Sequence, residues 1–149
     1  MAATVRTGLE RLLDDPALIR GRRFAVLANQ ASVTPDLVPA WRSLATCGGR
    51  LVQLFAPEHG LWGLAQDMEA VAGAHDSELK VPVVSLYGTS PESLVPAPEH
   101  LSGLAAVVVD LPDVGCRYYT FAATLAHVMA ACARAGCAPA PSPWPPLYR

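Results

Sequence analysis

A carboxylate and an imidazole stand side by side directly after an apolar run of this chain. Leu51 to Ala56 are largely apolar, Pro57 follows them, and Glu58 and His59 come next. Proline cannot donate a hydrogen bond to a sheet, so the predicted strand ends there. In open α/β sheets, ligands bind beyond the carboxyl ends of the strands. Both side chains can transfer protons, and the pattern therefore indicates a site, with a solvated loop as the alternative.

Polar side chains also follow three other predicted strands. Asn29 and Gln30 come after residues 23–28, Tyr87 after residues 81–86, and the stretch from Asp110 to Tyr119 after residues 104–109. Taken singly, each set has an ordinary explanation as a turn cap or a packed ring. Together, carboxylates, amides and aromatic rings at one sheet edge are typical of a sugar site.

The spacing of apolar residues predicts the elements that position these groups. We expect helices over residues 7–19, 36–47 and 119–135, a proline-broken turn over 91–100 and a long loop over 57–80. Strands that alternate with helices favour a parallel sheet with right-handed crossovers. The predicted fold class is α/β, as a Rossmann-like three-layer fold with a mostly parallel sheet that is truncated at its carboxyl end.

Composition narrows the function classes. The chain has 149 residues, 52% of them hydrophobic, and a formal net charge of -2, which disfavours nucleic acid as a partner. No run is long enough to span a membrane and no signal peptide is visible, so the expected location is the cytoplasm. The G-x-G-x-x-G, G-x-x-x-x-G-K-[ST] and G-x-S-x-G motifs are absent, which argues against nucleotide binding and a serine hydrolase.

The metal-ligating residue types show no metal-site spacing. Cys47, Cys116, Cys132 and Cys137 form no C-x-x-C pair, and we expect buried free thiols, with a packing role for Cys116. We therefore predict no metal and no cofactor. A weaker alternative is a metal-dependent hydrolase that uses His59, His75 and Asp110.

Several motifs together resemble a known family. LFAPEHGLWG, VPVVSLYG and VVVDLPDVGCRYYT resemble, in order and spacing, segments of the amino-terminal Rossmann-like domain of the NamZ-type exo-β-N-acetylmuramidases. The resemblance implies a glycoside hydrolase that removes terminal N-acetylmuramic acid from the non-reducing ends of peptidoglycan fragments during cell-wall recycling. Peptidoglycan-derived amino sugars are then the expected partners. The alternative is a remnant that binds muropeptides or sugars without turnover.

The resemblance also implies roles for individual residues, with Glu58 as the acid/base and a pocket that raises its pKa. Asp113, Glu69 and Asp110 are alternatives for the second carboxylate. Arg117 is expected to pair either with the lactyl carboxylate of the sugar or with an acid of its own loop. The implied catalytic residues are Glu58, His59 and Asp113, and the implied substrate-binding residues are Asn29, Gln30, Trp62, Gln66, Glu69, Tyr87, Arg117, Tyr118 and Tyr119.

Two segments depart from the family pattern. In GLAQDME, the expected acid is shifted to Asp67 or Glu69. After the last predicted helix the chain becomes proline-rich. We therefore expect an incomplete catalytic domain over residues 1–136 and an extended or disordered tail over 137–149, with the family's carboxyl-terminal domain absent and little activity in this chain.

Overall fold

The computed structural model describes residues 5–66 and 68–141 of the chain and contains one sheet. Within these residues the strand order is β3-β4-β2-β1-β5-β6. All recorded strand pairs are parallel except the β3–β4 pair. The strands are β1 (Arg23–Ala28), β2 (Arg50–Ala56), β3 (Ala74–His75), β4 (Pro82–Ser85), β5 (Ala106–Asp110) and β6 (Ala138–Pro141).

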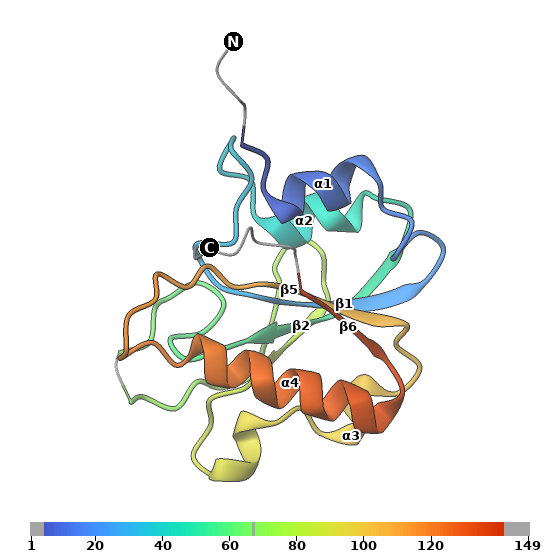
Figure 1. The fold of residues 1–149 in the computed structure, drawn as a ribbon. Coiled ribbons are helices and arrows are strands. Elements are labelled where there is room, and N and C mark those ends of the chain that lie inside the picture. Colours follow the sequence, from blue (N-terminus) through green and yellow to red (C-terminus); the bar gives the residue numbers. More distant parts are fainter. Residues whose placement is uncertain (1–4, 67, 142–149) are drawn as a thin grey trace.

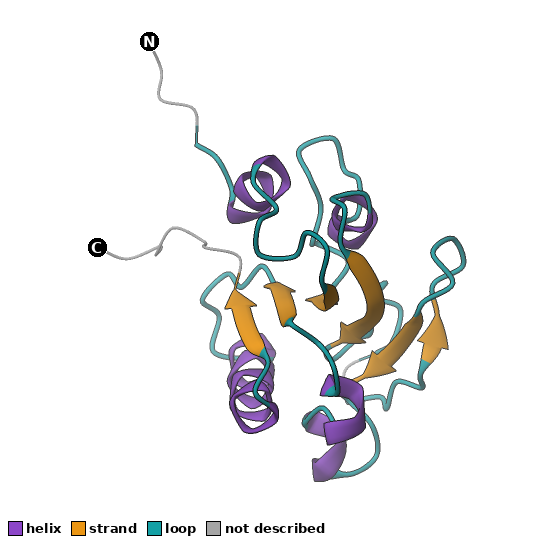
Figure 2. Ribbon diagram, turned by 90° about the vertical axis from the view of Figure 1, so that its right-hand side faces the viewer, coloured by secondary structure: helices purple, strands orange, loops and turns teal. Residues whose placement is uncertain are grey.

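Helices cover both faces of this sheet, which gives the three predicted layers (Figure 1). The first two helices lie on one face, and α3 and α4 lie on the other (Figure 2). The Rossmann-like α/β prediction is confirmed. The helices are α1 (Gly8–Asp14), α2 (Ala40–Ala45), the 3-10 helix η1 (Pro91–Leu94), α3 (Pro98–Leu101) and α4 (Phe121–Ala135).

The helices are shorter than the apolar periodicity predicts, and local chemistry explains their ends. Thr7 and Glu10 form a capping box at the start of α1, which satisfies free N–H groups. Helix α2 begins only after Pro39. Helix α4 ends at Ala135 and is capped by Gly136, which has a left-handed φ of 71°.

Each face of the sheet carries its own hydrophobic core. Phe24, Val26 and Ala28 of β1 pack with Trp41 and Leu44 on the α1 and α2 face. Ala25 and Leu27 of the same strand pack on the α4 face. Because successive side chains of a strand point to opposite faces, a strand covered on both sides must be apolar throughout. This explains the continuous apolar runs.

Strand β6 is a finding that the sequence did not predict. The expected tail over 137–149 begins in the structure with a strand that pairs with β5, so the sheet does have a strand there. The Ala138 N–H donates to Ala105 O at 3.1 Å. Because N–H groups alternate sides along a strand, Pro139 and Pro141 take the positions that face away from β5, where an edge strand tolerates proline. Residues 142–149 lie outside the described part.

A buried carboxylate fastens the end of the long loop to α2. Asp76, 1% exposed, accepts hydrogen bonds from Trp41 Nε1 at 3.2 Å and from the backbone N–H groups of Glu78 and Leu79 at 3.0 and 2.7 Å. These bonds outweigh the effect of burial, which by itself raises the pKa of the carboxyl, so the pKa of Asp76 lies below its ordinary value. Asp76 therefore has a structural role.

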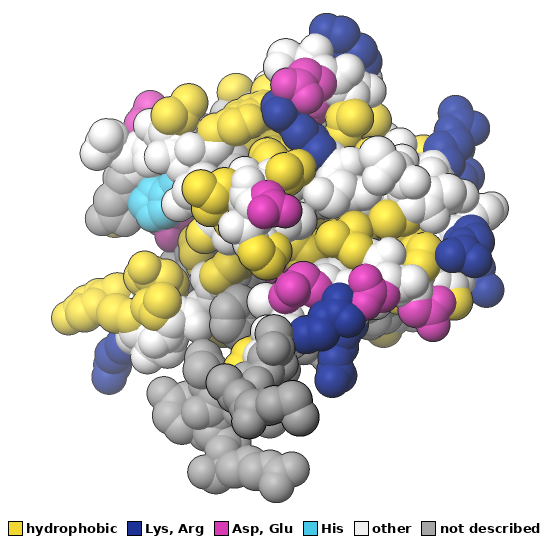
Figure 3. All heavy atoms as spheres, turned by 90° about the horizontal axis from the view of Figure 1, so that it is seen from above, with side chains coloured by type: hydrophobic (Ala, Val, Ile, Leu, Met, Phe, Trp, Pro, Cys, Tyr) yellow, Lys and Arg dark blue, Asp and Glu magenta, His cyan; other side chains and the backbone are white. Residues whose placement is uncertain are grey.

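The surface and the cysteine side chains can be compared with what the sequence predicts about charge, membrane spans and buried thiols. Seen from the α1 and α2 side, acidic, basic and apolar side chains are interspersed (Figure 3). In the described part, no helix is both long and apolar enough to cross a bilayer. Cys132 and Cys137 are buried and Cys47 is half-buried, as expected. Cys116 is exposed and belongs to neither core, so the predicted packing role for it is wrong.

Candidate functional site

Glu58 is a buried carboxylate at the carboxyl edge of the sheet. It is 6% exposed and lies two residues after the end of β2. Thr120 Oγ1 donates a hydrogen bond to Glu58 Oε2 at 2.7 Å. Tyr87, just after β4, and the backbone N–H of Met68 also bond to this carboxyl group. The structure therefore brings Glu58 together with groups that follow β4 and β5.

These contacts determine the charge of Glu58. Burial by itself raises the pKa of the carboxyl, but the hydrogen bonds from Thr120, Tyr87 and Met68 and the charge of His59 lower it below the ordinary value. The structure therefore lowers the pKa of Glu58, and the raised pKa expected from the sequence is wrong. The donors outweigh desolvation because each one stabilises the ionised form, so Glu58 is a carboxylate at neutral pH.

The backbone after Glu58 turns sharply. His59 has a φ of 68° and Gly60 a φ of 79°, and a left-handed conformation is uncommon for a residue with a side chain. His59 Nδ1 lies 3.1 Å from Ala65 O, which ties the ring to its own loop. The imidazole is half-buried beside Glu58. The two side chains that the sequence singled out thus remain neighbours, with His59 held by its loop.

Asn29 joins the ends of β1 and β5. It is buried, and its Oδ1 accepts a hydrogen bond from the Ala31 N–H at 3.0 Å. Its own N–H donates to Ser32 Oγ at 3.0 Å, and Ser32 Oγ in turn donates to the carbonyl oxygen of Asp110. Asp110, the last residue of β5, is also buried. The amide of Asn29 therefore caps a turn in addition to any role in binding.

Gln30 is exposed and lies against the loop that carries Glu58. A Cβ atom added to Gly63 would lie 2.6 Å from Gln30 Cδ, so the glycine allows the amide side chain to approach this closely. Gly63 also has a φ of 65°, which glycine adopts without strain. The end of β1 is thereby in contact with the loop after β2.

We expect Gly63→Ala to weaken binding of the predicted amino sugar, because the new methyl group must displace Gln30. Gly21→Ala is the matched control, since Gly21 has a similar φ of 70° and nothing within 4 Å of its Cβ position. Both variants should lose about 1–2 kcal/mol of unfolding free energy from left-handed strain, measured by urea denaturation. Equal sugar binding by the two variants in titration calorimetry would contradict a role for Gln30.

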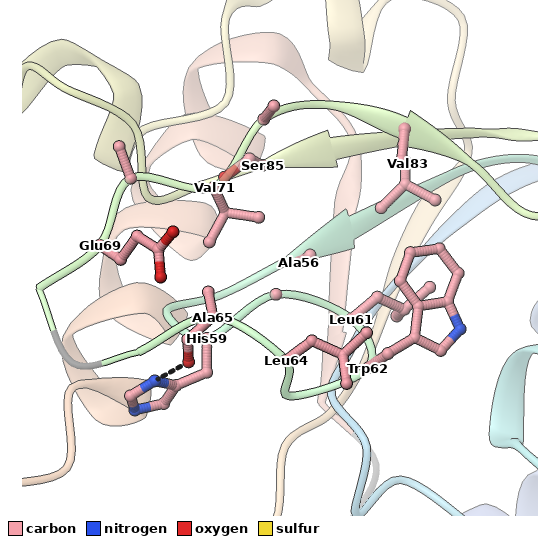
Figure 4. Close-up of a pocket in the computed structure, with 14 residues that line it drawn as sticks. Ala56, His59, Leu61, Trp62, Leu64, Ala65, Glu69, Val71, Val83 and Ser85 are labelled. Atoms are coloured by element: carbon pink, nitrogen blue, oxygen red, sulfur yellow. Dashed lines mark hydrogen bonds between the residues drawn. The ribbon is translucent and has the colours of Figure 1, made fainter.

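A pocket of about 370 Å³ is lined by the end of β2 and by the loop that follows it (Figure 4). Ala56 and His59, on either side of the Pro57–Glu58 pair, line it. Trp62 and Glu69 line it too, and Figure 4 shows them on the same loop, with Leu64 and Ala65 between them in sequence. Trp62 is 41% exposed. A pocket lined by both an accessible indole and a carboxylate suits a sugar, whose apolar face packs on aromatic rings while its hydroxyl groups bond to acids.

Two further predicted residues belong to this loop. Gln66 is exposed, and its backbone N–H donates to Glu69 Oε2 at 3.0 Å. This bond holds one carboxylate oxygen of Glu69 against the backbone of its own loop. Asp67, the other position to which the expected acid was shifted, lies outside the described residues.

The loop after β5 carries the remaining candidates. Asp113 Oδ1 accepts a hydrogen bond from the Gly115 N–H at 2.7 Å, which stabilises a turn. Tyr118 is 89% exposed and Arg117 is exposed as well. In the part of the chain that the structure describes, Arg117 forms no ion pair, so the expected pairing with Asp110 or Asp113 is not present. Its guanidinium is available to a ligand.

Tyr119 differs from its neighbour in the same loop. It is 45% exposed, and its ring lies edge-on to that of Phe121 with the centroids 5.5 Å apart. This contact supports the start of α4. Tyr119 therefore has a packing role, whereas Tyr118 is open to solvent.

The metal-dependent alternative finds no support in the geometry. Among residues 5–66 and 68–141, His, Cys, Asp and Glu side chains form no group of three or more that could hold a metal ion. His75 lies in β3, at the far edge of the sheet from β5 and Asp110. The three side chains that this alternative requires come from the loop after β2, from β3 and from β5.

Thr120 is the contact residue that sequence reasoning missed. It is the last residue of the VVVDLPDVGCRYYT motif and falls in the first turn of the helix predicted over residues 119–135. The available signal was its place directly before α4, at the edge where the other polar groups gather. Its partner lies 62 positions earlier, and local patterns do not reveal such a pairing.

Comparisons with known proteins give a consistent result. A family model described as "Exo-beta-N-acetylmuramidase NamZ, N-terminal" matches residues 24–139. The peptidoglycan beta-N-acetylmuramidase NamZ of Bacillus subtilis (strain 168) is 36% identical over 129 residues, which make up 85% of this chain and 30% of that protein.

Two solved structures of DUF1343 family proteins from Bacteroides fragilis are also similar. One has a TM-score of 0.79 and 30% identity, and the match covers 91% of this chain and 33% of the other. The second has a TM-score of 0.75 at 23% identity, covers 96% and 35% of the two chains, and shows the shared fold. The chain thus spans about a third of the length of the proteins it matches.

Proposed function

The chain belongs to the family of the amino-terminal domain of the exo-β-N-acetylmuramidase NamZ, and from this we propose that its carboxyl-edge site acts on terminal N-acetylmuramic acid of peptidoglycan fragments. The observation that carries the proposal is the buried Glu58 carboxylate, which bonds to Thr120 and Tyr87. The next residue, His59, lines a pocket together with an accessible indole. Glycoside hydrolysis needs a carboxyl group held next to a sugar-shaped cavity.

Glu58 is the residue to which we assign proton transfer. Its lowered pKa keeps it ionised at neutral pH, which suits a base or a nucleophile. To protonate the glycosidic oxygen it must first take up a proton, and exclusion of water by a bound sugar favours that, because desolvation raises the pKa of a carboxyl. Binding of the sugar therefore favours the protonated form of Glu58, which can act as the acid catalyst.

Arg117 is the group that we assign to the lactyl carboxylate of N-acetylmuramic acid. It is exposed in the loop after β5 and forms no ion pair within the described residues. A guanidinium binds a carboxylate through two parallel hydrogen bonds. Tyr118, next to it and exposed, offers a ring to the sugar. The assignment of Asp113 as the second catalytic group stays a prediction, since one of its oxygens is bonded to Gly115.

A second candidate function is sugar binding without turnover. The observation that favours it is the ionised state of Glu58, since a carboxylate can accept hydrogen bonds from sugar hydroxyl groups without transferring a proton. In this case the same pocket and the same loop would hold the sugar. The two functions differ only in whether the glycosidic bond breaks.

A chromogenic β-glycoside of N-acetylmuramic acid separates these functions. Purified chain that hydrolyses the bond will release the chromophore in proportion to time and protein, whereas a binding module will give saturable binding in calorimetry and no colour. The matching N-acetylglucosamine glycoside is the control, because it lacks the lactyl carboxylate that Arg117 would bind. The proposal would be contradicted if both glycosides were hydrolysed or bound equally well, or if neither was hydrolysed or bound.

A further inference from the structure

Thr120 has an unusual contact for a threonine that precedes a helix. A threonine at this position normally accepts a hydrogen bond from an N–H of the first helical turn. Thr120 makes no such bond to α4, and its backbone is in the helical region, with φ -92° and ψ -4°. Its hydroxyl donates instead to Glu58 Oε2 at 2.7 Å. The Thr120 side chain thus bonds to the Glu58 carboxylate and does not cap α4.

The backbone of Thr120 is fixed independently of Glu58. Its carbonyl oxygen accepts hydrogen bonds from the Thr124 N–H at 3.0 Å and from Thr124 Oγ1 at 3.2 Å, and Thr124 is buried. The ring contact between Tyr119 and Phe121 holds the residues on both sides. Thr120 is therefore anchored at the start of a 15-residue helix.

Glu58, by contrast, lies on the long loop. The next residue has a left-handed backbone, and one of the donors to Glu58, the Met68 N–H, belongs to an exposed residue of the same loop. Thr120 supplies a donor from a helix, outside that loop. We propose that Thr120 is a positioning residue that orients the Glu58 carboxylate, and this rests on the proposed function only in taking Glu58 as the reacting group.

The proposal has a consequence that does not depend on activity. A hydroxyl donor stabilises the ionised carboxylate, so its removal must raise the pKa of Glu58. The other groups that act on the carboxyl are the charge of His59, the phenol of Tyr87 and the Met68 N–H, and all of them remain when Thr120 is replaced. A change in the pKa can then be assigned to the lost hydroxyl.

Thr120→Val and Thr120→Ser form the test pair, because valine keeps the shape without the donor and serine keeps the donor. The pKa of Glu58 is read from the carboxyl carbon in NMR of ¹³C-glutamate-labelled protein, with Glu58→Gln to assign the signal. We expect a higher pKa in Thr120→Val and the wild-type pKa in Thr120→Ser. Thr46→Val, which removes an exposed hydroxyl bonded only to Ser43 O, should leave it unchanged.

Kinetics supply the second measurement. Loss of the donor should lower kcat about 10- to 100-fold, as for a hydrogen bond to a charged group, with little change in KM. The limb of the pH profile that reports Glu58 should move to higher pH. Thermal unfolding confirms that each variant is folded. An unchanged Glu58 pKa in Thr120→Val overturns the proposal. If Thr120→Val raises the pKa of Glu58 but the wild-type chain hydrolyses no substrate, the positioning role of Thr120 is supported. That result would count against the proposed function alone.

Discussion

Replacing Glu58 with glutamine should lower hydrolysis of N-acetylmuramic acid glycosides by about 10²- to 10⁴-fold, the usual contribution of a positioned acid or base. Glutamine has nearly the same volume, and its amide oxygen can still accept the hydrogen bond from Thr120. It can neither take up nor release a proton at neutral pH. The change therefore removes proton transfer and leaves the shape of the site intact. The initial rate of chromophore release measures the effect.

Two controls make this result interpretable. Glu99→Gln changes an exposed acid on α3, which lies on the face opposite α1 and α2, and should keep the wild-type rate. Sugar binding by Glu58→Gln, measured by calorimetry, should stay within about tenfold of wild type, because the amide can still form hydrogen bonds. A Glu58→Gln variant with the wild-type rate would show that another residue transfers the proton.

The largest effect on stability should come from Asp76→Ala, which removes the acceptor of three hydrogen bonds in a buried position. Hydrogen bonds to a charged group contribute about 1.5–3 kcal/mol each, and a buried donor left without a partner costs about 1–3 kcal/mol. The Trp41 N–H would be such a donor, since Trp41 is 3% exposed. We expect a loss of about 3 kcal/mol or more in urea unfolding, with an unchanged m-value.

Asp76→Asn and Glu78→Gln refine this prediction. Asparagine keeps one oxygen for the backbone N–H groups of residues 78 and 79, but its NH₂ group cannot accept from Trp41, so its loss should be smaller than that of alanine. Glu78→Gln removes only the ion pair with Arg42 Nη2 at 2.9 Å, which is partly exposed. Such a pair contributes about 0–1 kcal/mol. Equal stability of Asp76→Ala and Glu78→Gln would contradict the structural role of Asp76.

The pH dependence of stability has a defined sign for Asp76. The pKa of its carboxyl is lower in the folded protein than in the unfolded chain. Its contribution is therefore present above the unfolded pKa, about 3.9, and is lost as the pH falls through the folded value. Wild-type stability should drop in this acid range, and the drop should be smaller in Asp76→Asn. An identical pH dependence of the two proteins would show that Asp76 is not the group responsible.

The strand positions could be predicted because their causes are local. Four apolar runs correspond to β1, β2, β4 and β5, and their alternating burial on two faces requires continuous apolarity. Pro57 ends pairing close to where the sequence indicates, so Glu58 comes to the carboxyl edge. Strand β6 escaped prediction because its prolines argue against a strand in general, and only its place at the sheet edge makes them tolerable.

The sequence by itself determined which polar residues reach the carboxyl edge, since a parallel sheet brings the ends of its strands together whatever their side chains do next. Only the tertiary structure decided how these residues pair. Two contacts join distant segments: the bond between Thr120 and Glu58 and the close approach of Gln30 to Gly63. The ionised state of Glu58 depends on the first of them. The physical reason is that periodicity and turn chemistry act over a few residues, whereas hydrogen bonds between loops depend on how the packed elements place individual atoms.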